Sequence, residues 1–196
     1  MLTHLSLLEQ AAKFKKSRSN LPNSAKVVEA LLELEKSAKQ EKTKYSLADL
    51  TGNWNLCFVT GTKKARKRAG IVLGAGKYIP RLIKIKISYQ KNTQQIANIG
   101  KVINSVKIGF VELSLTGPIK FMPSKRILVF DFTYLKIVVL GLSLYDGYIK
   151  NGLKKEAEFE QKEIKHQAFF SYFLIQDNLI AARGRGGGLA LWSREE

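Results

Sequence analysis

Few residues in this sequence have the types and spacings that carry catalysis or hold a metal ion. The two histidines, His4 and His166, are far apart, and the single cysteine, Cys57, has no Cys or His at a metal-ligand spacing. No Ser or Cys lies in a recognisable nucleophile motif, and the acidic residues between positions 156 and 163 lie among lysines, as expected of a solvated surface. We therefore predict a protein that is not an enzyme and that holds no metal or other cofactor.

Positive charge is the main chemical feature of the chain, and it is unevenly distributed. The net charge is +17, and residues 51–126 contain fifteen Lys and Arg against one Asp or Glu. Such a concentration attracts an anionic partner, which can be a nucleic acid, an acidic protein or a membrane with anionic lipids. Composition alone leaves these three open.

Two helices are expected before the basic region. Residues 2–16 and 24–39 each place apolar side chains along one stripe, and the segment 20–24 between them supplies a turn and an N-cap. Neither helix is long enough to be stable alone in water, so we predict a helical hairpin packed on a larger unit. Residues 1–46 are assigned to this hairpin and a polar linker, and residues 47–196 to the main domain.

From residue 49 onward the pattern becomes that of a β domain. In residues 82–89, the isoleucines and Tyr89 occupy one face and Lys84, Lys86 and Ser88 the other, which indicates a half-buried strand with a basic outer face. Turn signals recur between short β-branched and aromatic runs, so we predict a mainly β protein whose antiparallel meander closes into a barrel. Residues 150–165 fit either a solvated helix or a long polar hairpin. The expected strands are 54–60, 82–89, 95–99, 106–115, 127–134, 137–144, 168–175, 178–183 and 189–193.

Two segments, one at each end of this β region, resemble motifs of a single protein family. Residues 50–60, LTGNWNLCFVT, look like the L-x-G-x-W-x-L-x-Y-T-T opening of the plastid-lipid-associated proteins, or fibrillins, which is also the lipocalin G-x-W signature. Residues 177–192, DNLIAARGRGGGLALW, resemble the closing motif of that family, although Ile180 stands where the family often has an arginine. The motif positions are Gly52, Trp54, Asp177, Arg183, Gly184 and Arg194.

The resemblance implies a lipocalin-like (calycin) barrel in which these residues are structural. Gly52 would permit a tight turn that places Trp54 across the barrel floor, with an acceptor for its indole N–H. By analogy with lipocalins, an arginine from the last strands covers the tryptophan ring, and Arg183 and Arg194 are the two candidates. The family also implies a quinone, carotenoid or acyl lipid as ligand, at thylakoid membranes or plastoglobules of photosynthetic organisms.

In such a barrel, the connection between the first two strands is a long loop beside the open mouth. Here the loop starts with a cationic cluster and continues into an apolar stretch, so we predict that it contacts anionic headgroups and dips into the acyl boundary. Alternatively, residues 71–73 are a buried strand and the cluster is a solvated loop. The cations are Lys63, Lys64, Arg66, Lys67, Arg68, Lys77 and Arg81, and the apolar residues are Ile71, Val72, Leu73, Tyr78 and Ile79.

The Gly-rich run at residues 184–188 is interpreted as a tight hairpin turn. RNA-binding RGG segments are disordered and repeated, and phosphate loops precede a helix, whereas this run lies between two apolar strands. Cys57, inside an expected strand, is interpreted as a small buried hydrophobe.

We expect a non-catalytic protein that binds or coats hydrophobic lipids, with an isoprenoid or other lipid ligand and an anionic membrane or lipid-body surface as partners. Its apolar runs are far shorter than the ~20 residues that cross a bilayer, and its single cysteine fits a reducing compartment. The expected location is cytoplasmic or plastid-stromal, peripheral to thylakoid membranes or lipid globules, without secretion. Two alternatives stay open: a basic barrel that binds nucleic acid, against which its scarce aromatics count, and an accessory protein partner of a prenyl-lipid or bilin enzyme.

Overall fold

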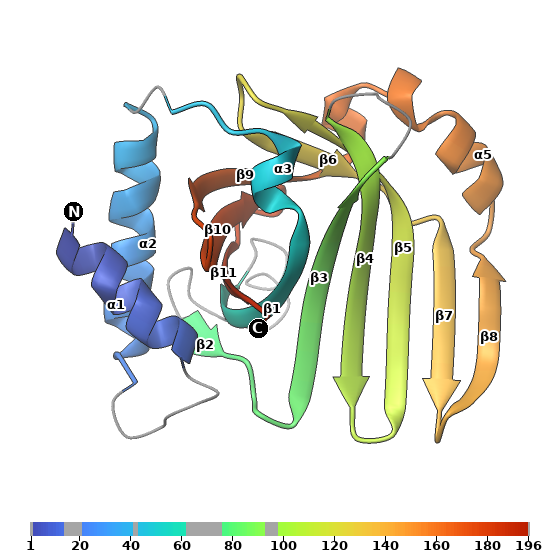
Figure 1. Cartoon of the computed structure of the whole chain (residues 1–196), viewed down its shortest axis with the longest axis horizontal. Helices are drawn as coiled ribbons and strands as arrows, with labels where there is room; N and C mark the ends of the chain where they lie inside the picture. Colours follow the sequence, from blue (N-terminus) through green and yellow to red (C-terminus); the bar gives the residue numbers. More distant parts are fainter. Residues whose placement is uncertain (1, 14–20, 41–42, 62–75, 93–97, 196) are drawn as a thin grey trace.

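The computed structural model describes residues 2–13, 21–40, 43–61, 76–92 and 98–195 (Figure 1). Three helices come first: α1 (Leu2–Ala12), α2 (Ser24–Ala38) and the single turn α3 (Leu47–Leu50). The Asn23 side chain accepts a hydrogen bond from the Ala25 N–H at 2.8 Å and caps α2. Ser46 and Asp49 form a reciprocal capping box that starts α3 immediately before the first strand.

Most of the remaining chain forms one antiparallel sheet that closes on itself. The cyclic order is β4-β3-β1-β11-β10-β9-β6-β5, and β5 pairs again with β4, so eight strands close a barrel. The predicted mainly β fold with a closed antiparallel barrel is therefore confirmed. The strands are β1 (Gly52–Thr60), β2 (Gly76–Tyr78), β3 (Ile83–Lys91), β4 (Ile99–Ile108), β5 (Val111–Met122), β6 (Ile127–Phe130), β7 (Tyr134–Val139), β8 (Leu142–Tyr148), β9 (Ala168–Ile175), β10 (Leu179–Gly184) and β11 (Leu189–Arg194).

The long strand β5 changes partner halfway along its length. Residues 119–122 pair with β6 inside the barrel, whereas residues 111–116 pair with β7, which in turn pairs with β8. Gly117 lies at this branch, where a side-chain carbon would come within 2.1 Å of the Asp131 carbonyl oxygen, so the close crossing requires glycine. Strands β7 and β8 thus extend the sheet of β3, β4 and β5 away from the barrel (Figure 1).

Helices α1 and α2 cover the outside of the barrel, where they contact β1, β2, β9 and β11 as well as each other. Leu8 of α1 and Val27 and Leu31 of α2 are fully buried in this contact. Cys57 is also fully buried on β1, and its thiol lies 3.8 Å from the Ala12 carbonyl oxygen, as expected for a small buried residue. The residues that join the two helices, 14–20, lie outside the described part of the chain, and the helical hairpin stays a prediction.

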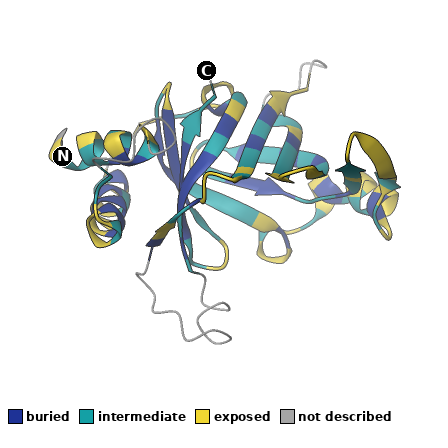
Figure 2. Cartoon of the chain, turned by 90° about the horizontal axis from the view of Figure 1, so that it is seen from below, coloured by how far each residue is buried: buried dark blue, intermediate teal, exposed yellow. Residues whose placement is uncertain are grey.

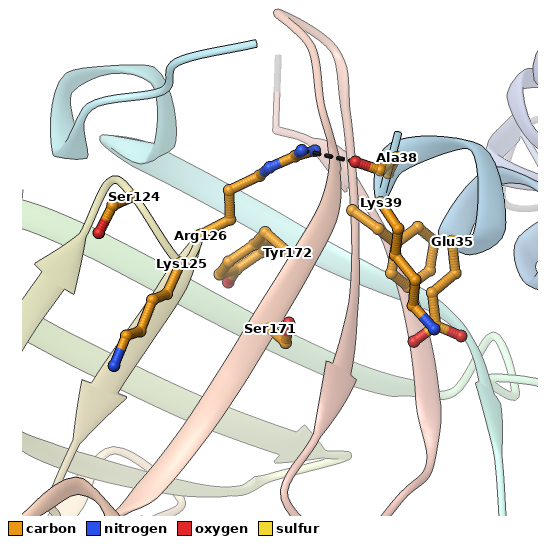
Figure 3. Close-up of a pocket in the computed structure, with 9 residues that line it drawn as sticks. Glu35, Ala38, Lys39, Ser124, Lys125, Arg126, Ser171 and Tyr172 are labelled. Carbon is orange, nitrogen blue, oxygen red and sulfur yellow. Dashed lines mark hydrogen bonds between the residues drawn. The ribbon is translucent and has the colours of Figure 1, made fainter. Parts of the chain in front are cut away.

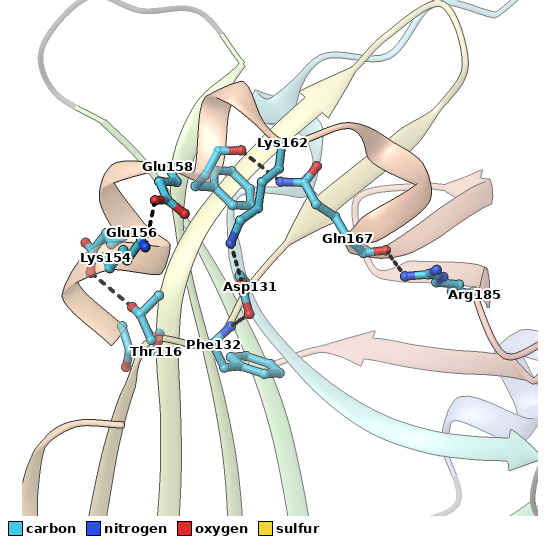
Figure 4. A network of polar contacts seen from close by, with 11 residues as sticks. Thr116, Asp131, Phe132, Lys154, Glu156, Glu158, Lys162, Gln167 and Arg185 are labelled. Atoms are coloured by element: carbon cyan, nitrogen blue, oxygen red, sulfur yellow. Dashed lines mark hydrogen bonds and ion pairs between the residues drawn. The ribbon is translucent and has the colours of Figure 1, made fainter. Parts of the chain in front are cut away.

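The segment after β8 packs over one end of the sheet (Figure 4). Phe159 anchors it, since this side chain is only 2% exposed, and the Gln167 amide donates to the Phe159 carbonyl at 2.9 Å. Lys162 reaches back to within 3.8 Å of Asp131. Residues 150–165 were expected to form either a solvated helix or a long polar hairpin, and the structure shows a helical segment. It consists of α5 (Gly152–Ala157) and the 3-10 turns η2 (Phe159–Gln161) and η3 (Ile164–His166).

Two of the expected strands contain a hairpin turn, and one contains a break. Strand 106–115 is interrupted at Gly109, and strand 137–144 at Leu140 and Gly141, while 127–134 is divided between β6 and β7. Gly109 and Gly141 have positive φ, 56° and 82°. The residues next to these turns are apolar, so the sequence pattern there looks like a continuous strand. The expected strand 95–99 lies mostly outside the described residues.

Candidate functional site

The opening motif joins the first strand of the barrel to the last. Trp54 is fully buried, and its indole N–H donates to the Leu50 carbonyl at 2.8 Å. The guanidinium carbon of Arg194 lies 4.1 Å from the centre of the Trp54 ring, and Arg194 also donates to the carbonyls of Thr51 and Asp177. Arg194, rather than Arg183, therefore covers the tryptophan.

The other motif residues are engaged in equally structural contacts. The Arg183 guanidinium forms a fork on the carboxylate of Glu35 in α2, with Nε 2.6 Å from Oε1, and this hydrogen bond raises the pKa of Arg183. The N–H of Gly184 donates to the Gly188 carbonyl at 2.9 Å across the turn between β10 and β11. The predicted tight hairpin turn is confirmed, and these residues hold the fold rather than a ligand.

The predicted cationic loop is described only at its end. Lys77 and Arg81 are exposed next to β2 and β3, as a headgroup contact would require. The rest of the loop falls outside the described residues: Lys63, Lys64, Arg66, Lys67, Arg68, Ile71, Val72 and Leu73.

The two described apolar residues of that loop are packed inside the protein. Ile79 is 8% exposed, and the Tyr78 ring meets the Phe58 ring edge-on with 5.1 Å between centroids. The Tyr78 hydroxyl donates to the Pro22 carbonyl at 2.8 Å, and burial, with a smaller contribution from Cys57, raises the pKa of Tyr78 to about 12. Neither side chain is available for the predicted insertion into lipid, because both already fill space between β1, β2 and the N-terminal helices.

Several aromatic side chains pack together inside the barrel. The Phe170 ring stacks on Phe130 at 5.1 Å and meets the Trp192 ring at 5.4 Å. The hydroxyls of Tyr89 and Tyr172 share a hydrogen bond at 2.7 Å, and burial raises the pKa of both. An apolar ligand needs apolar surface that remains uncovered.

The extended part of the sheet presents such a surface. We call one row of paired residues across the strands a rung. Side chains on every second rung lie on the same face of the sheet as the buried Ile87 and Tyr89. Fifteen positions on three rungs make up this open face, and all are apolar except Asn104 and Gly147. The rungs are Ile83, Ile108, Val111, Val139 and Leu142; Ile85, Val106, Leu113, Ile137 and Tyr145; and Ile87, Asn104, Leu115, Leu135 and Gly147.

The open face leads out of the core into solvent. Ile87 is 4% exposed and belongs to the core, whereas Val111 is 46% exposed and Leu142 is 70% exposed. In Figure 2, the end of the sheet away from the N-terminal helices, where β8 lies, is coloured mostly as exposed. With strands about 4.8 Å apart and equivalent rungs about 6.8 Å apart, the face measures roughly 19 Å by 14 Å. The largest apolar patch on a soluble monomer is typically about 300–600 Å² and often functional, and this face approaches that size.

The opposite face of the same strands is basic. Lys84, Lys86 and Lys107 surround a hollow of about 230 Å³ together with Ser105 and Glu112. Lys107 lies 3.7 Å from Glu112, and Lys86 pairs with Glu195, while Lys84 has no ion pair with any residue described in the structure. The extended sheet is thus amphipathic, with one aliphatic face and one cationic face.

A second hollow, of about 200 Å³, lies between the end of α2 and β9 (Figure 3). The Arg126 guanidinium donates to the Ala38 carbonyl at the C-terminus of α2 at 2.5 Å, with Lys39 and Lys125 beside it. An arginine at this place stabilises the helix end and fixes α2 to the barrel. The contacts explain how the helix is held.

Within the described segments, no three His, Cys, Asp or Glu side chains come together as metal ligands, and no helix is long and apolar enough to cross a membrane. A scan against protein-family models finds no match, and a search of curated proteins finds no significant relative. The family resemblance therefore stays a prediction, and the function has to be inferred from the open face and its surroundings.

Proposed function

We propose that the protein binds hydrophobic lipids on the open face, without catalysis, and acts beside a membrane or lipid body. The observation that carries this proposal is the continuity of an uncharged aliphatic surface from the buried Ile87 to the exposed Leu142. The face spans about 270 Å², and since part of it is already buried at Ile87, covering the rest provides at most about 7 kcal/mol at 25 cal/mol per Å², before the costs of binding. Quinones, carotenoids and acyl lipids, the ligands implied by the family resemblance, all offer apolar chains of suitable length.

The composition of the face favours a lipid chain over a polar ligand. Asn104 is its only polar side chain apart from the Tyr145 hydroxyl, which donates to the Tyr148 carbonyl at 2.7 Å. A lipid chain needs no hydrogen-bond partners, so it loses nothing on this surface, whereas a nucleotide or a sugar would leave its polar groups unpaired. Lysines on the other face and along the rim provide contacts for an anionic headgroup.

Two neighbouring residues of β7 allow a matched test. Ile137 lies on the open face, and Val138 lies on the opposite face; both are half-buried and aliphatic. We expect Ile137→Lys to abolish binding of cis-parinaric acid, a fluorescent fatty acid, by the purified full chain, because it places a charge in the middle of the apolar surface. Val138→Lys should retain binding.

Lipid extraction of the purified protein followed by mass spectrometry identifies the natural ligand. Light scattering, performed on the same samples, reports whether a second copy covers the face. Equal probe binding by the two variants, absence of probe binding by the unmodified chain, or a dimer that only Ile137→Lys dissociates would each refute the proposal.

A further inference from the structure

Two hairpin tips at one end of the extended sheet expose large apolar side chains. We use hairpin tips for the turns Gly109-Phe110, between β4 and β5, and Leu140-Gly141, between β7 and β8. Phe110 is 76% exposed and Leu140 is 70% exposed, and Leu82, just before β3, is 86% exposed. Sheet register places all three at the same level, because Ile83, Ile108, Val111, Val139 and Leu142 form one rung. They line the lower edge of the sheet in Figure 1.

Leu140 occupies a backbone position that disfavours leucine. Its φ is +53°, and Gly141 follows with φ +82°, so both central residues of a two-residue hairpin loop have positive φ. Asn-Gly is the favoured pair in such a loop, and a bulky residue there is unusual. An exposed leucine at a strained position contributes nothing to folding, so its presence indicates contact with something apolar outside the protein.

The residues behind the tips are those expected at a membrane interface. Between Lys136 and Asp146, which form an ion pair at 2.8 Å, the hairpin contains nine residues without any charge. Tyr134 and Tyr148 pack edge-on at 5.2 Å two rungs beyond this ion pair and close the far end of the hairpin. Lys136 is four residues of strand, about 13 Å, from Leu140, so the uncharged part of the hairpin is shorter than the hydrocarbon layer of one bilayer leaflet, about 15 Å.

We propose that the hairpin tips insert into one leaflet of an anionic bilayer and hold the exposed end of the open face at its surface. The segment 81–150 contains eleven Lys and Arg against three Asp and Glu, and Lys84 and Lys107 lie one rung behind the first apolar rung. A negative surface would attract this edge before the tips enter it. The outer edge of β8 pairs with no strand in the described part of the chain. Its backbone N–H and C=O groups therefore need water or headgroups as hydrogen-bond partners, which limits insertion into the hydrocarbon to the tips.

A bilayer fits this edge better than a protein does. The Leu140 N–H donates to the Phe110 carbonyl at 3.0 Å, so the two tips form one exposed edge, and a fluid bilayer surrounds such an edge without the complementary groove that a folded partner would need. The inference is independent of the proposed function, because insertion requires the tips and lysines alone, whereas ligand binding requires the open face.

The test uses flotation of the full chain with vesicles of phosphatidylcholine, alone or with added phosphatidylglycerol. We expect Leu140→Asn to weaken binding to the anionic vesicles about tenfold and at the same time to raise the unfolding midpoint, since Asn-Gly suits the turn. The control is Leu153→Asn, which removes a leucine that is 64% exposed on α5, at the other end of the sheet (Figure 1). This control should leave flotation unchanged.

Two further variants complete the design. Phe110→Ser should also weaken flotation, and Lys84→Gln should weaken binding to anionic vesicles only. Parinaric acid binding should persist in Leu140→Asn and Phe110→Ser, which separates this inference from the proposed function. The inference is overturned if the unmodified chain does not float with anionic vesicles, or if Leu140→Asn floats as well as the unmodified chain. It is equally overturned if only neutralisation of residues 63–68 abolishes flotation, or if the tips hold a dimer in solution.

Discussion

Replacing Gly52 by alanine tests how the first and last strands are joined. Gly52 has φ +125°, and an added side-chain carbon would lie 2.5 Å from Nη1 of Arg194. The backbone strain costs about 1–3 kcal/mol. Moving the guanidinium off the Trp54 ring costs a further ~1 kcal/mol for the cation–π contact, and a weakened hydrogen bond to the Thr51 carbonyl adds about 1 kcal/mol. We therefore expect Gly52→Ala to destabilise the fold by about 3–5 kcal/mol, or to lower Tm by roughly 6–20 °C for a chain of this size.

A double-mutant cycle with Arg194→Ala isolates the contact itself. Once the guanidinium is absent, Gly52→Ala retains only its backbone cost of about 2 kcal/mol, so the two changes should be less than additive by about 1–2 kcal/mol. Urea unfolding followed by tryptophan fluorescence and by far-ultraviolet circular dichroism measures each free energy of unfolding. If Gly52→Ala costs the same in both backgrounds, Arg194 does not occupy the space next to Gly52, and the reasoning fails.

Three more predictions concern helix attachment, alkaline stability and the thiol. Arg183→Ala should cost about 1 kcal/mol, because its ion pair with Glu35 is partly exposed, and should accelerate hydrogen exchange in α2 without changing exchange in β3 and β4. The pKa values of Tyr89 and Tyr172 are raised in the folded state, so the unfolded chain loses protons first; stability should be constant below about pH 10 and fall above it by up to ~1.4 kcal/mol per pH unit for each tyrosine. Urea midpoints from pH 8 to 11 check this, and a Tyr89→Phe/Tyr172→Phe variant that kept the same slope would contradict it. Cys57 should react with a thiol reagent only at the rate of unfolding, so rapid labelling of the native protein would disprove its burial.

The sequence predicted much of the barrel because alternation is a local property. The alternation in residues 82–89 assigned Ile87 and Tyr89 to the inside and Lys84 and Lys86 to the outside, and the structure agrees. The Gly-rich turn before β11 was also predicted correctly, since a tight turn depends only on the few residues that form it. The turns at Gly109 and Gly141 were missed, because aliphatic residues that end up exposed have the same appearance in a sequence as residues that continue a buried strand.

The candidate site was located less well than the fold. Sequence analysis placed lipid contact on the loop up to Ile79, but Tyr78 and Ile79 are packed against β1 and the helices. The residues of the open face were visible as alternating apolar positions in 111–115 and 135–139, yet nothing in that pattern distinguishes a covered strand from an uncovered one. Burial depends on which strands lie opposite, and that depends on the partner change within β5.

The sequence by itself determined the β class of the domain, the two amphipathic helices, the two faces of β3 and the basic excess of residues 51–126, because composition and periodicity express these directly. Only the tertiary structure decided which arginine covers Trp54, which apolar residues form the core and which form the open face and the hairpin tips. These outcomes depend on contacts between residues far apart in the chain. A side chain such as Leu113 or Leu140 has the same chemistry in either environment, and strand pairing alone determines whether protein, solvent or lipid surrounds it.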